Sequence, residues 1–323
     1  MVELEFDRVV GLARGYQETR ILLTASELDL FLILNHTPLS AREIAEPRHW
    51  NAEALGALLD ALTVMGFLEK TLERYVVARV NRDLLSDDDS RKMSHIIRHA
   101  ASGWDSWSGL TARVTNGGEL QVGPELAHAA EAAHAAVQPL ASGIAALVRP
   151  ESGRRFLDVA AGSGAFTIAF LDRDRGLRGT ILERAEVLEV TRLHLHDEDY
   201  DGQVELVASD FVSEPWPKEQ DLVFLSAILH MRPPTECRTM ITHAFNCLNS
   251  GGRIVIRDHV MSEDRLVPRA GTLCTVQMLV TATGGAPRTF AEMREWLLSA
   301  GFRDVRVLQD GERVNGLVEA FKP

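Results

Sequence analysis

Hydrophobic residues in the first hundred positions recur at spacings of three and four, the period of one helix face. Ser40-Ala-Arg-Glu43 adds a capping box, in which the serine and glutamate side chains each accept the other residue's backbone N–H. After Gly66, a typical helix terminator, the pattern changes to short strands. The predicted elements are helices over 20–34, 41–45 and 52–65 and strands over 67–70 and 75–80. Helix, short helix, helix and hairpin is the order of a winged helix.

From residue 151 onward, short apolar runs alternate with helical patterns, which predicts an α/β domain with a largely parallel sheet. The predicted strands cover 156–159, 179–183, 204–208, 221–225, 251–258, 305–308 and 316–321. An amphipathic helix that ends at Gly301 precedes the last two strands. Residues 101–150 are predicted to form connecting helices. The chain is therefore expected to contain an N-terminal, mainly helical domain and a C-terminal domain with a seven-stranded sheet.

Small or polar residues end three successive predicted strands. The first strand runs into the turn Ala160-Ala-Gly-Ser-Gly164 and then into a helix, which exposes backbone N–H groups to a ligand above the sheet. The second strand ends in Glu183, an acid placed to accept hydrogen bonds from a ribose diol. The third is followed by Asp210 and Phe211, an acid and an aromatic ring suited to an adenine. These features predict a nucleoside site.

Dinucleotides and S-adenosylmethionine are the two nucleoside classes that compete for this site. A dinucleotide fingerprint needs a third glycine where this chain has Thr167. The sequence instead resembles the class I S-adenosylmethionine-dependent methyltransferases, whose first motif reads hydrophobic-Asp-x-Gly-x-Gly-x-Gly, with Ala160 in place of the first glycine. The resemblance implies a Rossmann-like seven-stranded sheet and S-adenosylmethionine as cofactor. It implies cofactor contacts at Asp158, Gly162, Gly164, Glu183, Asp210, Phe211 and Ser226.

The N-terminal region resembles that of the caffeate and hydroxyindole O-methyltransferases, including bacterial members that tailor antibiotics. In that family the winged helix serves dimerisation, and the resemblance is carried by Glu27-Leu-Asp-Leu-Phe31 and residues 54–67. It implies a dimerisation domain over 1–100, helices that line the substrate pocket over 101–150, a methyltransferase domain over 151–323, and a homodimer. DNA binding is the competing interpretation of a winged helix, but residues 51–60 carry acids where a recognition helix carries Arg and Lys.

His230 is the candidate general base. It follows the fourth predicted strand, and an imidazole has a pKa suited to taking a phenol or enol proton near neutrality. Leu229-His230 matches the family's Leu-His-Asp-Trp segment, whose histidine is the base, although Met231 and Arg232 replace Asp-Trp. Asp258 ends the fifth strand and is expected to fix the tautomer of His230; the alternative is an acid that caps the next segment.

The acceptor side of the site is less marked. A second family acid, just before Arg-Thr of a later motif, is replaced by Pro287. The residues expected to line the acceptor pocket are Trp107, Gln277, Met278 and Thr281. Core packing is the alternative role for the tryptophan and the methionine.

Composition narrows the partners of the chain. The 323 residues are 46% hydrophobic and 25% charged, as in ordinary globular proteins. A net charge of −12 disfavours nucleic acid as a partner, because phosphate binding needs clustered Lys and Arg. There is neither a basic signal-peptide start nor a run of transmembrane length, and the three cysteines lack Cys-x-x-Cys spacing. We therefore expect a cytoplasmic protein that does not bind membranes.

Three functions are compared. The leading one is O-methylation of a small hydroxylated metabolite of aromatic or polyketide-like type. The second is C-methylation of an α-keto acid or enol, with a metal held by His230, Asp258 and His259; it is disfavoured because adjacent strand residues point to opposite faces, and no metal is expected. The third is a ligand-sensing winged-helix regulator without catalysis, disfavoured by the missing basic patch.

Overall fold

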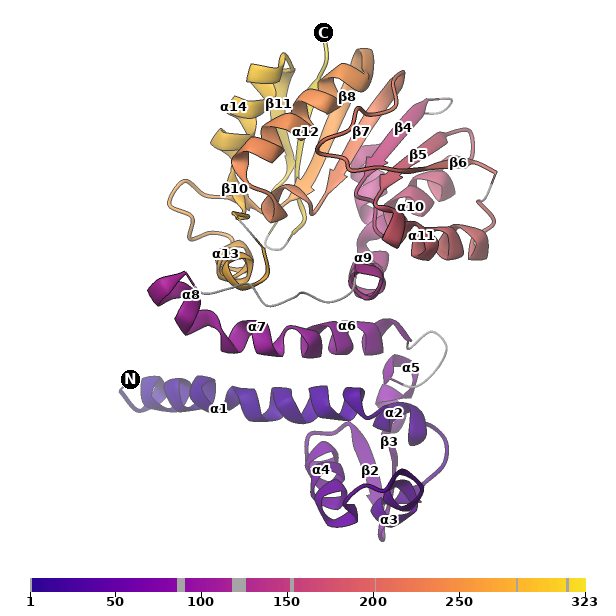
Figure 1. Ribbon diagram of the computed structural model, residues 1–323, viewed down its shortest axis with the longest axis vertical. Coiled ribbons are helices and arrows are strands. Elements are labelled where there is room, and N and C mark those ends of the chain that lie inside the picture. The colour runs from indigo at the N-terminus through magenta and orange to yellow at the C-terminus, as the bar shows by residue number, and fades with distance from the viewer. Residues whose placement is uncertain are drawn as a thin grey trace. The chain divides into compact units, whose positions relative to one another are not determined.

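The computed structural model describes residues 2–85, 91–117, 126–151, 154–200, 202–282, 284–311 and 314–323. It divides into two units, residues 1–102 and residues 103–323. Figure 1 shows the first unit from indigo to purple and the second from magenta to yellow.

The first unit is mainly helical. Its helices are α1 (Val2–Glu27), α2 (Leu30–Ile33), α3 (Ala41–Ala45), α4 (Ala52–Val64), α5 (Arg82–Leu85) and α6 (Arg91–Ser102), with 3-10 turns η1 (Glu46–Arg48) and η2 (Arg79–Asn81). Its strands are β1 (Leu39–Ser40), β2 (Leu68–Thr71) and β3 (Arg74–Val77). They form an antiparallel sheet in the order β1-β3-β2.

Local signals explain most of these boundaries. The predicted capping box is present, since the Ser40 side chain accepts the Glu43 N–H and the Glu43 side chain accepts the Ser40 N–H. Gly66, with φ of 82°, lies in the left-handed region just after α4. The predicted helix over 20–34 had the wrong bounds: α1 begins at Val2 and the chain breaks at Asp29, whose φ of 53° cannot continue a right-handed helix.

The second unit begins with the connecting helices α7 (Trp104–Ser108), α8 (Leu110–Asn116) and α9 (Leu126–Val148). The sheet strands are β4 (Arg155–Val159), β5 (Arg178–Glu183), β6 (Val204–Ala208), β7 (Gln220–Ser226), β8 (Leu248–Asp258), β11 (Arg303–Gln309) and β12 (Gly316–Phe321). The other elements are α10 (Ala165–Arg173), α11 (Ala185–Asp197), η3 (Leu229–Met231), α12 (Pro234–Cys247), β9 (Val260–Met261), α13 (Arg269–Thr281), β10 (Arg288–Thr289) and α14 (Phe290–Ala300).

The seven strands predicted from the sequence form one sheet in the order β11-β12-β8-β7-β4-β5-β6. Strands β8, β7, β4, β5 and β6 are parallel, and β12 joins β8 and β11 antiparallel. Apolar side chains of α12 and α14 pack on one face of the sheet, and those of α9, α10 and α11 pack on the other (Figure 1). The fold is therefore a three-layer α/β arrangement, as expected.

This topology fixes the place of the candidate site. Because β4, β5, β6, β7 and β8 are parallel, their carboxyl ends meet at one edge of the sheet. The turn after β4, Glu183 of β5, Ser226 of β7 and Asp258 of β8 all lie at that edge. The short parallel pair of β9 and β10 was not predicted, since two-residue strands leave no hydrophobic period to detect.

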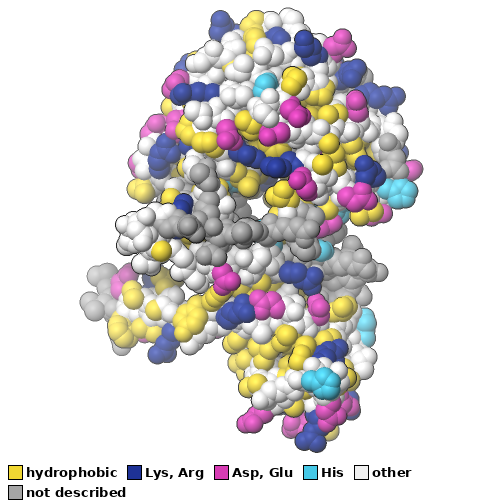
Figure 2. Space-filling model, viewed as in Figure 1, with side chains coloured by type: hydrophobic (Ala, Val, Ile, Leu, Met, Phe, Trp, Pro, Cys, Tyr) yellow, Lys and Arg dark blue, Asp and Glu magenta, His cyan; other side chains and the backbone are white. Residues whose placement is uncertain are grey.

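On the face of the molecule in Figure 2, Lys and Arg side chains are interspersed with Asp and Glu side chains. In the first unit, Asp60 of α4 accepts a hydrogen bond from Lys70 at 2.6 Å. Within the described residues, no helix is long and apolar enough to cross a membrane.

Helix α1 carries an exposed apolar stripe that predicts a homodimer. Four large hydrophobic side chains on one face of the helix are 58–72% exposed: Phe6, Val9, Leu12 and Tyr16. Burying such a stripe against a second copy is favourable, and an isologous interface is the commonest arrangement. We expect the full chain to sediment as a dimer at micromolar concentration and Leu12→Glu to shift it towards monomer. Leu72→Glu, at an isolated exposed leucine, serves as control; a monomeric parent protein would contradict the prediction.

Candidate active site

The turn after β4 is built from left-handed residues. Ala160, Gly162 and Gly164 have φ values of 56°, 58° and 80°. A Cβ added at Gly162 would meet no atom within 4 Å, whereas one at Gly164 would lie 3.3 Å from a Thr191 methyl group. The backbone is therefore open to a ligand at Gly162 and packed against α11 at Gly164. Ala160 adopts a conformation that favours glycine, which explains the glycine at this place in the family motif.

Glu183 connects the end of β5 to this turn. Its Oε2 accepts the Gly162 N–H at 2.8 Å and its Oε1 accepts the Arg184 N–H at 2.7 Å. Burial raises the pKa of the Glu183 carboxyl, while the two backbone N–H groups oppose that shift. Each carboxylate oxygen has further acceptor capacity, so the side chain can receive the two hydroxyl groups of a diol. The predicted turn and the predicted ribose acid thus lie together.

Asp158 lies beneath the turn, 1% exposed, on β4. Its Oδ2 accepts the Thr167 hydroxyl at 2.8 Å, and its Oδ1 has no hydrogen-bond partner within the described part of the chain. Burial raises the pKa of the Asp158 carboxyl to about 7, and the nearby Glu183 acts in the same direction. This orphaned oxygen is a group that a ligand donor can satisfy.

Asp210 and Phe211 follow β6. Asp210 is exposed and accepts the Val212 N–H at 3.1 Å, and this backbone N–H lowers the pKa of its carboxyl. Phe211 is buried, and the Arg232 guanidinium lies 5.3 Å from the centre of its ring. Arg232 occupies the place of the family's tryptophan beside the base, so a cation here covers the aromatic ring predicted for the nucleobase.

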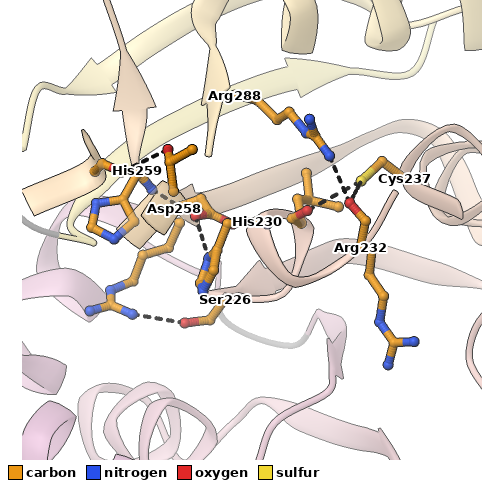
Figure 3. A network of polar contacts seen from close by, with 11 residues as sticks. Ser226, His230, Arg232, Cys237, Asp258, His259 and Arg288 are labelled. Atoms are coloured by element: carbon orange, nitrogen blue, oxygen red, sulfur yellow. Dashed lines mark hydrogen bonds and ion pairs between the residues drawn. The ribbon is translucent and has the colours of Figure 1, made fainter. Parts of the chain in front are cut away.

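His230, which is partly buried, forms a pair with the buried Asp258 (Figure 3). His230 Nδ1 lies 2.7 Å from Asp258 Oδ1, and the His230 backbone N–H donates to Asp258 Oδ2 at 3.2 Å. The His259 N–H donates to Asp258 Oδ1 at 2.7 Å. Burial alone would lower the pKa of the His230 imidazole, but the charge and hydrogen bond of Asp258 raise it above its ordinary value. The predicted base and the predicted acid are in direct contact.

The 3-10 turn that carries His230 is held from several sides. Arg288 donates to the Arg232 carbonyl oxygen at 2.7 Å, and the Cys237 thiol donates to the Leu229 carbonyl oxygen at 3.3 Å. The Ala227 N–H donates to the Arg257 carbonyl oxygen at 2.7 Å, which joins the end of β7 to β8. In Figure 3, Arg288 and Cys237 converge on Arg232 while Asp258 lies between the two histidines. These contacts fix the direction of the imidazole.

The residues predicted to line the acceptor pocket lie on two helices that contact each other, α7 and α13. Trp107 is 42% exposed on α7, and Met278 is buried on α13. Gln277 and Thr281 are exposed, and the Thr281 hydroxyl donates to the carbonyl oxygen of Gln277. The structure brings the helices together, and the contact of these four side chains with an acceptor stays a prediction.

Several polar residues of the site were missed at the sequence level. Thr167 and Thr191 support the turn, the latter by donating to the Gly162 carbonyl oxygen at 2.6 Å. His134 of α9 is buried, with Nδ1 2.8 Å from the Ser163 hydroxyl in the turn. Arg257 is buried against Ser226. Only Arg257 gave a signal, as a charged residue that interrupts an apolar strand.

The metal-assisted alternative finds no support in the side-chain arrangement. His259 packs near His230, with ring centres 5.7 Å apart, and burial lowers the pKa of its imidazole. Among the described residues, no group of three or more His, Cys, Asp or Glu side chains is placed to hold a metal ion.

Comparison with known proteins relates this geometry to chemistry. Residues 144–303 match an O-methyltransferase domain, and residues 10–87 match an O-methyltransferase dimerisation domain. A 3-hydroxy-5-methyl-1-naphthoate 3-O-methyltransferase of Streptomyces sahachiroi is 28% identical over 97% of this chain and 94% of its own. The tetracenomycin polyketide synthesis 8-O-methyl transferase TcmO of Streptomyces glaucescens is 26% identical over 92% of this chain and 91% of its own.

A solved structure extends the likeness to the whole fold. Human N-acetylserotonin methyltransferase, in complex with S-adenosylmethionine, superposes with a TM-score of 0.82 over 98% of this chain and 97% of that one. The two sequences are 21% identical, so this likeness concerns the fold. The open turn at Gly162, the Glu183 carboxylate and the orphaned Asp158 oxygen fit an adenosyl cofactor.

The strain at Ala160 gives a prediction for stability. A left-handed alanine costs about 1–2 kcal/mol, and glycine loses about 0.5–1 kcal/mol more chain entropy on folding. We expect Ala160→Gly to raise the free energy of unfolding by about 0.5–1 kcal/mol, measured by denaturant titration. Ala161→Gly, at a neighbour outside the left-handed region, is expected to lower it. Equal destabilisation by both substitutions would contradict the prediction.

Proposed function

Because this chain belongs to the S-adenosylmethionine-dependent small-molecule O-methyltransferases, we propose that it methylates a hydroxyl group of an aromatic or polyketide-like metabolite, with His230 as general base. The contact between His230 and Asp258 is the observation that carries the proposal. S-adenosylmethionine supplies an activated methyl group, so the protein has to position the acceptor and remove its proton.

The proposed cofactor contacts follow the strand ends. Glu183 accepts the ribose hydroxyl groups, and the backbone at Gly162, where the turn is open, and at Gly164 borders the cofactor. Asp210 and Phe211 are the groups assigned to the adenine, Phe211 from a buried position next to Arg232, and Asp158 supports the turn from below. Ser226 lies at the end of the next strand, β7, towards His230. What supports this assignment is the convergence of these groups at one edge of the sheet.

Asp258 sets the protonation pattern of the proposed base. It accepts the N–H at Nδ1 of His230, which leaves the lone pair of Nε2 for the acceptor. Nε2 would accept the proton of the acceptor hydroxyl, and the Asp258 carboxylate would stabilise the imidazolium formed. The bound cofactor would supply the methyl group, with its carbon–sulfur bond broken and the neutral thioether S-adenosylhomocysteine as leaving group. His230 must be neutral at the start, so its raised pKa sets the lower pH limit of the reaction.

The names of the relatives support the class of acceptor. One acts on a hydroxynaphthoate and another in tetracenomycin polyketide synthesis, so both substrates carry an oxygen function on a polyketide or fused aromatic skeleton. Trp107, which is 42% exposed, and Met278 of the neighbouring helix α13 are the flat and polarisable side chains assigned to contact such a ring. The match of residues 10–87 to a dimerisation domain supports a homodimer.

Removal of the ribose acid is expected to weaken cofactor binding. Glu183→Ala deletes both carboxylate oxygens, and loss of hydrogen bonds to a charged group costs about 1–3 kcal/mol, or about 5- to 150-fold in dissociation constant. Calorimetric titration with S-adenosylhomocysteine measures the change. Glu186→Ala, at an exposed acid in the first turn of α11, serves as control. Unchanged affinity in the Glu183 variant would remove this residue from the site.

Removal of the base is expected to slow turnover without changing cofactor binding. His230→Ala should lose about 10²–10⁴-fold in kcat while its affinity for S-adenosylhomocysteine stays near that of the parent. His259→Asn, at the neighbouring imidazole, is expected to lose far less. Asp258→Asn should lower turnover and also move the acidic limb of the pH profile to lower pH, because it removes the carboxylate that raises the pKa of His230. Near-normal turnover of His230→Ala across neutral pH would leave positioning as the whole mechanism.

A further inference from the structure

Arg257 is a buried cation that pairs with no carboxylate among the residues that the structure describes. Its side chain belongs to β8 and is 1% exposed. One terminal nitrogen donates to Ser226 Oγ at 3.1 Å and the other to Asn315 Oδ1 at 2.8 Å. Nε has no hydrogen-bond partner within the described residues. A guanidinium has five N–H donors, so this one is under-used for a group so deeply buried.

The neighbouring charges are already engaged. Arg253 lies on the same face of β8 and pairs with Glu319 at 2.9 Å. Asp258 follows Arg257 in the chain, but its carboxylate accepts three N–H groups from His230 and His259. Arg257 therefore holds its charge with two neutral oxygens and the ring of Phe166, 4.9 Å away.

Such an arrangement is costly in the free protein. Moving an ion out of water costs several kcal/mol unless an opposite charge and hydrogen bonds replace its hydration. Burial lowers the pKa of the Arg257 guanidinium to about 10, although the charge of Asp258 acts in the opposite direction. An anionic ligand group would supply the missing partner.

The position of the guanidinium indicates which ligand can reach it. Arg257 and Ser226 are cross-strand partners at the carboxyl ends of β8 and β7. Phe166 lies in the first turn of α10, which directly follows the turn after β4. Glu183 ends β5, two strands from β7 in the sheet order, which is about 10 Å at the usual strand spacing. S-adenosylmethionine held at Glu183 by its ribose can extend past the turn after β4 and bring its amino-acid group to Ser226.

We propose that Arg257, together with the Ser226 hydroxyl, forms a subsite for a ligand carboxylate. The proposal rests on the proposed function, because it needs an adenosyl group at the neighbouring strand ends. The amino-acid carboxylate of S-adenosylmethionine is the source that the position favours. A carboxylate on the acceptor is the other source, since one relative of this chain acts on a naphthoate. Guanidinium and carboxylate form strong, charge-assisted hydrogen bonds.

Paired ligands test the proposal. Calorimetric titrations compare S-adenosylhomocysteine with 5′-methylthioadenosine, which keeps the adenosyl sulfide but lacks the amino-acid arm. In Arg257→Met the affinity for S-adenosylhomocysteine should fall about 10- to 100-fold while that for methylthioadenosine is retained. If the acceptor supplies the carboxylate, both nucleosides keep their affinity and the loss is confined to 3-hydroxy-2-naphthoate as against 2-naphthol, each titrated with S-adenosylhomocysteine present.

Controls separate this effect from general damage. Arg253→Met removes a second arginine from the same face of β8, and Glu319 keeps Arg306 as partner, so the ligand ratios should not change. Arg257→Lys and Ser226→Ala should show smaller losses with the same ligand selectivity, and they carry the test if Arg257→Met does not fold. Equal losses for both members of each pair, or no loss for any ligand, would overturn the proposal. Failure of the parent protein to bind S-adenosylhomocysteine would instead overturn the proposed function.

Discussion

The Asp258 carboxylate lies in the interior at the end of β8, where three N–H donors satisfy it: two from His230 and one from His259. A buried carboxylate is tolerated only with such a set of donors, so the position of each donor is constrained by the charge. Burial alone would raise the pKa of Asp258, but the contact with His230 lowers it, and the same contact raises the pKa of His230. The contact between His230 and Asp258 thus fixes the turn after β7 to the next strand and sets the direction of the imidazole.

The carboxyl groups of Asp158 and Glu183, nearer the turn after β4, differ from Asp258 in their hydrogen bonding and in the direction of their pKa shifts. Asp158 keeps one oxygen without a partner in the described structure, and burial raises the pKa of both Asp158 and Glu183. Asp258, fully hydrogen-bonded, has a lowered pKa although it is equally buried. The difference follows from the charge of His230 beside Asp258 and from the hydrogen bonds that His230 and His259 donate to it. Asp158 and Glu183 have acceptor capacity left for a ligand. The edge of the sheet therefore carries both a carboxylate satisfied by the protein, Asp258, and two carboxylates with acceptor capacity left, Asp158 and Glu183.

The sequence predicted the parts of this site that depend on strand ends. Parallel strands bring their carboxyl ends together, so the turn at Gly162, Glu183, His230 and Asp258 had to meet once the strands were identified. Contacts that depend on side-chain direction were not predictable in this way. His134, on the alanine-rich helix α9, forms a hydrogen bond with Ser163 in the turn after β4. Arg288 donates a hydrogen bond to the carbonyl oxygen of Arg232, which lies far from it in the chain. The break between α1 and α2 at Asp29 depends on a single backbone conformation, which the spacing of hydrophobic residues does not reveal.

At the end of β8, two adjacent residues of opposite charge, Arg257 and Asp258, have different partners. Consecutive strand residues point to opposite faces, so Arg257 points towards Phe166 of α10 whereas Asp258 points towards His230. Their opposite charges lie close enough to stabilise each other through space without a hydrogen bond between them, which leaves each side chain free for its own partners. With Arg257 in the proposed carboxylate subsite, a ligand held at one face of β8 would present its reacting centre to His230, the proposed base, at the other. The alternation of side chains along β8 would then place the carboxylate subsite and the residues proposed for proton removal at a fixed distance from each other.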